Sequence, residues 1–237
     1  MLPSFSIVIP CFNEAARIGE TLRLTLDYLA GAAPESELIV VNDGSTDATA
    51  SIAREVLENT KVATRLLENF PNRGKGAAVR SGLLAAQKPI GLFSDADLST
   101  PLAETPKLIE PIARGEIDIA FGSRALDRSL IGIRQPWRRE QAGRVFNLLV
   151  RAATGLPFWD TQCGFKAFRL NVCRPIIEAA RIDGFAFDVE LLYLARRAGL
   201  RIQEIPVRWN HSEGSKVRFF HDSLGMLREV IALRARL

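Results

Sequence analysis

The first half of this chain alternates short apolar runs rich in Val and Ile with longer segments of helical periodicity. The apolar runs lie at residues 4–10, 37–42, 62–67, 90–94 and 117–122. The helical segments between them begin near Glu14, Asp47, Lys75 and Pro101. Parallel strands are buried on both faces, and each parallel pair needs a crossover, usually a helix, between its strands. The alternation therefore predicts an α/β fold with a mostly parallel central sheet.

Length and composition are those of one ordinary globular domain. The 237 residues are 47% hydrophobic and 24% charged, and 31 Lys and Arg against 27 Asp and Glu leave a net charge of +4. This mild basicity suits anionic partners such as sugar nucleotides, lipid phosphates or an acidic membrane surface. Because there is no Lys/Arg-rich tail and no RNA-binding or zinc-finger signature, we expect no nucleic-acid partner.

The cysteines and the hydrophobic stretches indicate a compartment. Cys11, Cys163 and Cys173 are widely spaced and form no Cys-x-x-Cys pair, which predicts neither a disulfide framework nor a zinc site. We interpret this as a protein of the reducing cytosol. Residues 1–5 carry no secretory signal, and no stretch approaches the roughly 20 apolar residues that span a bilayer. Any membrane contact would therefore be peripheral.

Polar side chains follow three of the predicted strands. Residues 10–14 (PCFNE), 42–45 (NDGS) and 95–97 (DAD) would meet at the carboxyl edge of the sheet, where ligands of open α/β folds bind. Asp95 and Asp97 offer hard oxygen ligands that Mg²⁺ or Mn²⁺ accepts while keeping positions for water and phosphate. This predicts a divalent metal beside a diphosphate. The alternative is that these aspartates only cap turns.

Residues 72–78 (NRGKGAA) form a Gly-rich start to a helix. Its free backbone amides and Lys75 are suited to anionic or polar groups of a nucleotide, whereas the small residues equally suit close packing of the helix on the sheet. The spacing is not that of a Walker A loop, and no Gly-x-Gly follows the first strand. A P-loop NTPase and a dinucleotide oxidoreductase are therefore disfavoured.

Arginines are dense between residues 124 and 144, where we expect a loop leading into a helix. They lie on both sides of Trp137, with Ile131 and Ile133 nearby. Such a stretch is either a solvated basic surface or a site for a lipid that carries a phosphate.

Residues 217–237 have the pattern of an amphipathic helix. Its predicted apolar face consists of Phe220, Leu224, Leu227 and Ile231. The face can pack on its own domain, on a second subunit in a homodimer, or on a membrane surface.

Five segments, taken in order, match the motifs of a known protein family. They are residues 7–14, 40–47 (VVNDGSTD), 72–76 (NRGKG), 95–97 (DAD) and 122–124 (GSR). In this order they resemble family 2 glycosyltransferases, and the match covers nearly the whole chain. Three later segments, at 159–166, 184–191 and 206–216, are more narrowly similar to dolichyl-phosphate glucosyltransferases and their prokaryotic polyprenyl-phosphate counterparts.

The resemblance implies a GT-A fold in a single domain over residues 1–237. Residues 1–123 would bind the nucleotide sugar, 124–216 would bind the acceptor, and 217–237 would form the C-terminal helix. The implied reaction is an inverting, metal-dependent transfer of glucose from UDP-glucose to a dolichyl or undecaprenyl monophosphate, at the cytosolic face of a membrane. The alternatives are GDP-mannose as donor, a hydroxyl acceptor, or a catalytically silent scaffold that binds nucleotide sugars.

The resemblance also implies site residues. The donor site would contain Pro10, Phe12, Glu14, Asp43, Lys75, Asp95 and Ala96. The catalytic set would be Asp95, Asp97 and Arg124, with the metal on Asp97 and Asp95. The acceptor phosphate would lie among Arg124, Arg134, Arg138, Ser215 and Lys216.

The acceptor decides whether a general base is needed. A phosphomonoester, with a second pKa of about 6, is largely anionic at neutral pH and can attack unaided once cations position it. A hydroxyl acceptor would need a base, for which Asp188 and Glu190 are the candidates. Either residue equally suits a structural role at the start of the helix predicted there.

Overall fold

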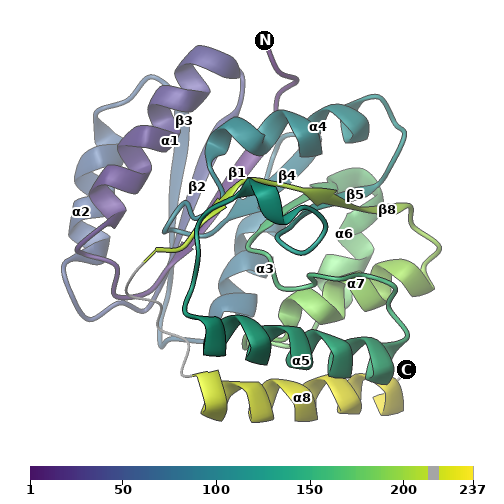
Figure 1. The fold of residues 1–237 in the computed structure, drawn as a ribbon. Coiled ribbons are helices and arrows are strands. Elements are labelled where there is room, and N and C mark those ends of the chain that lie inside the picture. Colours follow the sequence, from purple (N-terminus) through teal and green to yellow (C-terminus); the bar gives the residue numbers. More distant parts are fainter. Residues whose placement is uncertain (213–218, 237) are drawn as a thin grey trace.

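The computed structural model describes residues 1–212 and 219–236. At its centre lies a seven-stranded sheet of order β3-β2-β1-β4-β7-β5-β8, with helices on both faces (Figure 1). Every pairing in this sheet is parallel except those of β7, which runs antiparallel to β4 and to β5. The predicted α/β fold with a mostly parallel sheet is confirmed.

The strands of the large sheet are β1 (Ser6–Cys11), β2 (Glu37–Asp43), β3 (Ala63–Asn69), β4 (Ile90–Ser94), β5 (Ile119–Ser123), β7 (Phe165–Arg169) and β8 (Ile202–Pro206). A separate pair is formed by β6 (Ile131–Ile133) and β9 (Trp209–Asn210). The five predicted strands coincide with β1 to β5 apart from one or two residues at their ends. The second half of the chain contributes β7 to the middle of the sheet, between β4 and β5.

The helices are α1 (Ile18–Ala32), α2 (Thr49–Glu58), α3 (Lys75–Ala85), α4 (Thr105–Ala113), α5 (Trp137–Thr154), α6 (Leu170–Ala179), α7 (Phe187–Arg197) and α8 (Phe219–Arg236). Short 3-10 turns lie at η1 (Leu102–Glu104) and η2 (Arg128–Leu130). The first helix starts later than predicted because the amides of Arg17 and Ile18 turn back onto the carbonyl of Glu14. The loop leading into a helix after Arg124 is confirmed by α5.

Alternating residues of the strands build two cores, one on each face of the sheet. Ile7 and Ile9 of β1 are fully buried against α1 and its neighbours, whereas Val8 points to the opposite face and joins the core under α3, α6 and α7. This is the two-residue period of a strand buried on both sides. Phe146 of α5 and Val230 of α8 extend the second core, so these helices cover that face.

Helix α8 lies alongside α5 at one side of the molecule (Figure 1). Among its described side chains, Met226, Val230 and Leu233 are buried, while Ile231 is 57% exposed. The predicted apolar face was therefore wrong at Ile231, because the helix turns the stripe beside it towards α5. The side chains of Phe220 and Leu224 lie outside the described residues. Packing of this helix on its own domain is confirmed.

Candidate active site

The loops after β1 and β2 are joined by hydrogen bonds at the carboxyl edge of the sheet. The amide of Asn13 donates to Ser45 Oγ at 2.9 Å, and the amide of Glu14 donates to Thr49 Oγ1 at 2.7 Å. The loop after β4 joins the same edge, since its Ala96 carbonyl accepts from Thr21 of α1 at 2.6 Å. The predicted convergence of the three strand ends is confirmed.

A cavity of about 210 Å³, here called the carboxylate cavity, opens at the end of β4. Asp95, Asp97, Asp188 and Lys75 line it, together with Arg124. The Nζ of Lys75 lies 2.6 Å from Asp95 Oδ1. Burial alone would lower the pKa of Lys75, but the surrounding carboxylates, Asp95 foremost, raise it, so this lysine stays charged.

The turn after β4 fixes the two aspartates. Asp97 Oδ1 accepts a hydrogen bond from the amide of Ser99 at 2.9 Å, which is the turn cap that the sequence allowed. The same side chain nevertheless lines the carboxylate cavity. Leu98 takes a φ of 46°, in the left-handed region that residues other than glycine rarely adopt. Strained residues of this kind gather at functional sites, where the surrounding structure holds them.

Gly164, just before β7, lies directly against Asp95. The amide of Asp95 donates to the Gly164 carbonyl at 3.0 Å. A Cβ built on Gly164 would lie 1.9 Å from Asp95 Oδ2, so only glycine leaves room for this carboxylate. Sequence reasoning missed Gly164 because its contact with Asp95 joins distant parts of the chain.

A second lysine, Lys166 of β7, is buried beneath the cavity. Its Nζ lies 2.7 Å from Asp188 Oδ1, and the two side chains are 0% and 5% exposed. The Nζ also donates to the Cys163 carbonyl at 2.5 Å. Burial raises the pKa of Asp188, and the positive charges of Lys166 and Lys75 oppose that rise. Lys166 was not predicted, although a lysine within an apolar strand was a usable signal.

Glu190, the other candidate base, serves the structure. Its carboxylate accepts hydrogen bonds from the amides of Arg181 and Ile182 at 2.7 to 3.0 Å, and the residue is 4% exposed. It lines neither of the two cavities described here. Of the two candidates, only Asp188 lies at the site.

The Gly-rich start of α3 is held by protein groups. The carboxylate of Asp43 accepts from the amides of Gly74 at 2.7 Å and Arg73 at 3.2 Å. The amides of Gly76 and Ala77 both donate to the Asp183 carbonyl. The prediction that these amides are free for an anion was therefore wrong.

Packing explains two of the small residues in α3 instead. A Cβ on Gly82 would lie 2.3 Å from a methyl group of Val8, and a Cβ on Gly76 would lie 2.4 Å from the Ile182 carbonyl. Close packing of this helix is thus confirmed, although Gly76 packs on the segment around Ile182 and Phe187, and Gly82, outside residues 72–78, packs on the sheet.

The remaining predicted donor residues lie outside both cavities. Pro10 is buried in β1, Phe12 is 37% exposed, and Glu14 forms an ion pair with Arg17 at 2.9 Å. Together with Asp43 they border the carboxyl ends of β1 and β2, beside the carboxylate cavity rather than in it. Ala96 is buried between the two aspartates.

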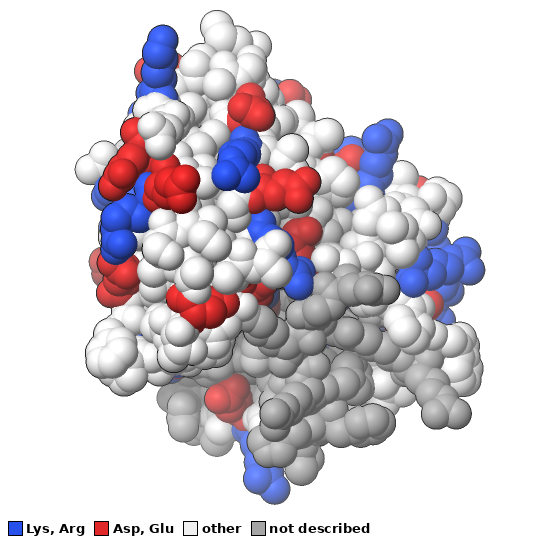
Figure 2. Space-filling model, turned by 90° about the vertical axis from the view of Figure 1, so that its left-hand side faces the viewer, with Lys and Arg blue, Asp and Glu red and all other residues white. Residues whose placement is uncertain are grey.

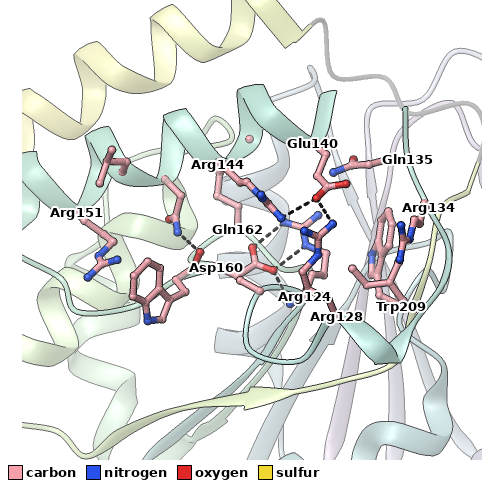
Figure 3. Close-up of a pocket in the computed structure, with 16 residues that line it drawn as sticks. Arg124, Arg128, Arg134, Gln135, Glu140, Arg144, Arg151, Asp160, Gln162 and Trp209 are labelled. Carbon is pink, nitrogen blue, oxygen red and sulfur yellow. Dashed lines mark hydrogen bonds and ion pairs between the residues drawn. The ribbon is translucent and has the colours of Figure 1, made fainter. Parts of the chain in front are cut away.

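A larger cavity of about 450 Å³, here called the arginine cavity, opens beside the first (Figure 3). Five of the described arginines line it, namely Arg124, Arg128, Arg134, Arg144 and Arg151. Apolar and aromatic side chains complete the wall, among them Leu148, Trp159 and Trp209. Arg124, Gln135, Gly143, Gln162 and Trp209 line both cavities. The two cavities therefore adjoin, with Arg124 on their common wall.

Arg124 is fixed by a buried partner. Its Nε and Nη2 each donate to one oxygen of Asp160 at 2.7 Å, and its amide donates to the same carboxylate at 2.8 Å. The centroid of the Trp209 ring lies 5.5 Å from Arg124 Cζ. Burial alone would raise the pKa of Asp160, but Arg124 holds it below its usual value. The guanidinium keeps a defined position between the cavities.

The acceptor residues proposed from the sequence are placed only in part. Arg134 lines the arginine cavity. Arg138 belongs to α5, but its side chain lies outside the described residues, as do Ser215 and Lys216. Arg128, Arg144 and Arg151 also reach the cavity, because η2 and α5 form its wall.

A metal fits the carboxylate cavity only with help from a substrate. Among the described residues, no three His, Cys, Asp or Glu side chains gather to hold an ion. Asp97 and Asp95 supply hard oxygens in one cavity, and Mg²⁺ commonly binds one or two carboxylates together with substrate phosphates. The residues present fit a divalent ion that completes its ligands with a diphosphate and water.

Comparison with known proteins gives a consistent picture. The family model described as Glycosyl transferase family 2 matches residues 6–176. A dolichyl-phosphate beta-glucosyltransferase of Drosophila melanogaster is 37% identical over 98% of this chain and 74% of its own. The enzyme of that name from Saccharomyces cerevisiae is 34% identical over 97% of this chain and 73% of its own.

A solved structure shares the fold. Glucosyl-3-phosphoglycerate synthase from Mycobacterium tuberculosis, crystallised with Mn²⁺, UDP and glucosyl-3-phosphoglycerate, aligns with a TM-score of 0.70 at 24% identity. The alignment covers 99% of this chain and 79% of that one. At this identity the likeness shows the shared fold and no more.

Proposed function

The chain belongs to glycosyl transferase family 2 and is a hexosyltransferase, and we propose that it transfers glucose from UDP-glucose to a polyprenyl monophosphate with inversion. The observation that carries this proposal is the pair of adjoining cavities. One presents the aspartates suited to a metal and a diphosphate, and the other presents arginines among apolar side chains. The names of the relatives supply the sugar and the class of lipid.

The donor would bind with its diphosphate at the carboxylate cavity. Asp97 and Asp95 would hold Mg²⁺ or Mn²⁺, which supplies Lewis-acid stabilisation of the charge that develops on the leaving diphosphate. Lys75 is a charged group at the same place, already oriented by Asp95. The nucleoside would extend over the ends of β1 and β2, along Pro10 and Phe12.

The acceptor would enter from the arginine cavity. An oxygen of its phosphate forms the new bond to the anomeric carbon as the bond to the diphosphate breaks, and UDP leaves. No proton has to be removed from a phosphate that is already anionic. The structure favours such an acceptor, because Glu190 is bonded to two amides and Asp188 is paired with buried Lys166.

We also propose that the enzyme works at the cytosolic surface of a membrane and contacts it through α5. Val145, Leu148 and Leu149 of this helix are 58%, 63% and 44% exposed, and Leu148 also lines the arginine cavity. A prenyl chain leaving the cavity would thus meet an apolar surface. Both signs of charge are interspersed over the described residues of the face shown in Figure 2. No described helix has the length and apolar character needed to cross a bilayer.

The reaction is tested by mass spectrometry of lipid products. The purified chain is incubated with Mg²⁺, a short polyprenyl phosphate and either UDP-glucose or GDP-mannose. We expect one glucosyl-phosphate lipid, formed from UDP-glucose and lost in Asp97→Ala. A mannosyl product would overturn the choice of donor. Transfer to the matching prenyl alcohol, dependent on Asp188, would overturn the choice of acceptor.

The membrane contact is tested by flotation with vesicles that contain anionic lipid. The paired variant Val145→Ser and Leu149→Ser should lose vesicle binding, whereas Leu24→Ser should keep it. Leu24 is a matched control because it is 51% exposed on α1, away from both cavities. Unchanged flotation of the paired variant, with a dimer detected by sedimentation, would assign α5 to a subunit interface instead.

A further inference from the structure

One carboxylate lies inside the arginine cavity and bridges two of its cations. Glu140, in the first turn of α5, places Oε1 2.5 Å from Arg128 and 2.9 Å from Arg144. In Figure 3 both interactions converge on this side chain, one from Arg128 of η2 and one from Arg144, a turn further along α5 itself. The carboxylate is 18% exposed, whereas the two guanidiniums are 45% and 50% exposed. Glu140 therefore sits where an anion from outside would bind.

The described lining of the arginine cavity carries more positive than negative charge, even with Glu140 in place. Among the described residues, its lining includes five arginines and two acids, Asp160 and Glu140. Asp160 is committed to Arg124 through three hydrogen bonds. Of the other four arginines, Arg128 and Arg144 pair with Glu140, so the described lining carries three positive charges in excess. A phosphomonoester, with a charge close to −2, suits that excess.

The contacts of Glu140 are of a kind that a phosphate can replace. Ion pairs between partly exposed side chains contribute little to stability, and here one oxygen serves both arginines. A phosphomonoester has three acceptor oxygens and can satisfy both guanidiniums at once with charge-assisted hydrogen bonds. A phosphodiester carries one charge, as Glu140 does, and gains far less by the exchange.

We propose that Glu140 occupies the acceptor-phosphate site of the free enzyme and acts as a selectivity residue there. The dianionic monoester of the acceptor displaces it from Arg128 and Arg144, whereas the singly charged headgroups of ordinary phospholipids do not. This inference rests on the proposed lipid-phosphate acceptor. Its physical basis is competition between one resident carboxylate and incoming anions of different charge.

The test uses Glu140→Gln, which keeps the shape and removes the charge. The KM for a short prenyl phosphate and the inhibition constant of a short-chain phosphatidylglycerol are measured at fixed UDP-glucose. We expect the acceptor KM to fall about fivefold and inhibition by the phosphodiester to strengthen by more than that, because the resident competitor is gone. The KM for UDP-glucose serves as the internal reference.

Matched variants separate this role from a structural one. Glu110→Gln removes an exposed glutamate of α4 that pairs with Arg114, and it should leave both constants unchanged. Arg128→Gln and Arg144→Gln should each raise the acceptor KM about tenfold. An acceptor KM that is unchanged or higher in Glu140→Gln would overturn the proposal, as would unchanged inhibition by the phosphodiester.

Binding measured without turnover separates the proposed role of Glu140 from the proposed transfer reaction. If the wild-type chain transfers no sugar to any prenyl phosphate, the proposed function fails. Calorimetric binding of the prenyl phosphate alone still tests the site. Tighter binding in Glu140→Gln supports the anion site, and unchanged or weaker binding refutes it.

Discussion

Replacing Gly164 by alanine should displace the carboxylate of Asp95 while leaving the fold in place. The added Cβ would lie 1.9 Å from Asp95 Oδ2, which is 1.5 Å inside the 3.4 Å at which ordinary contact begins. The three nearest atoms all belong to the end of the Asp95 side chain. The side chain can retreat where the backbone cannot, so the site changes more than the fold does.

The size of the effect follows from that displacement. A retreat of about 1.5 Å would lengthen the 2.6 Å contact between Asp95 and Lys75 and move an expected metal ligand. Misplacement of a catalytic group by about 1 Å can reduce a rate about 100-fold, which corresponds to roughly 2.7 kcal/mol of transition-state stabilisation. Overpacking should lower the free energy of unfolding by about 1 to 3 kcal/mol.

The assay is the initial rate of glucosyl lipid formation, with urea unfolding measured on the same preparations. Gly31→Ala is the control, since a Cβ on Gly31 of α1 meets nothing within 4 Å. This control should keep its rate and gain up to about 1 kcal/mol of stability. A folded Gly164→Ala enzyme within twofold of the wild-type rate would refute the reasoning. If that variant does not fold, a near-normal rate in Asp95→Asn would refute the reasoning instead.

Two further predictions concern stability. Lys166→Met leaves the buried carboxylate of Asp188 without its partner and should lower the free energy of unfolding in urea by about 3 to 5 kcal/mol. The double variant Lys166→Met with Asp188→Leu should recover most of this loss. Equal losses of stability in the single and double variants would contradict the prediction. Burial alone would raise the pKa of Glu37, but hydrogen bonds from Ser6 and Gln87 and the charge of Arg65 bring it below its usual 4.5. The stability that results is present above pH 4.5 and is lost as the pH falls through the lower pKa of Glu37 in the folded chain. Glu37→Gln should therefore flatten the acid side of a curve of unfolding free energy against pH. An unchanged curve would refute this prediction.

The sequence predicted what depends on local pattern. Strands β1 to β5 alternate with helices, and their apolar runs identify them without knowledge of the partners. The position of β7 was not predictable in this way, because an antiparallel strand from the second half enters between β4 and β5 through contacts far apart in sequence. Lys166 and Gly164 acquire their roles only through that insertion.

In the candidate site, too, local pattern predicted some residues, and long-range contacts determined the roles of others. Asp95 and Asp97 follow a strand end directly, so topology alone placed them at the binding edge. Asp43 lies at such an edge too, yet its carboxylate is bonded to amides about 30 residues later in the chain. The partner of Arg124 was equally hidden, since Asp160 lies 36 residues away. Long-range hydrogen bonds thus decided which predicted polar residues remain exposed to a ligand.

The two cavities differ in charge, and this difference indicates where a metal is required. Lys75 and Arg124 face three carboxylates in the carboxylate cavity, so a diphosphate there would meet a wall with a net negative charge. Its binding needs an added cation, whereas the arginine cavity already carries excess positive charge. Chelation of divalent ions should therefore weaken UDP-glucose binding at least tenfold and leave binding of a prenyl phosphate unchanged in calorimetry. Equal sensitivity of both ligands to chelation would show that the charges of the two cavities do not govern their ligands.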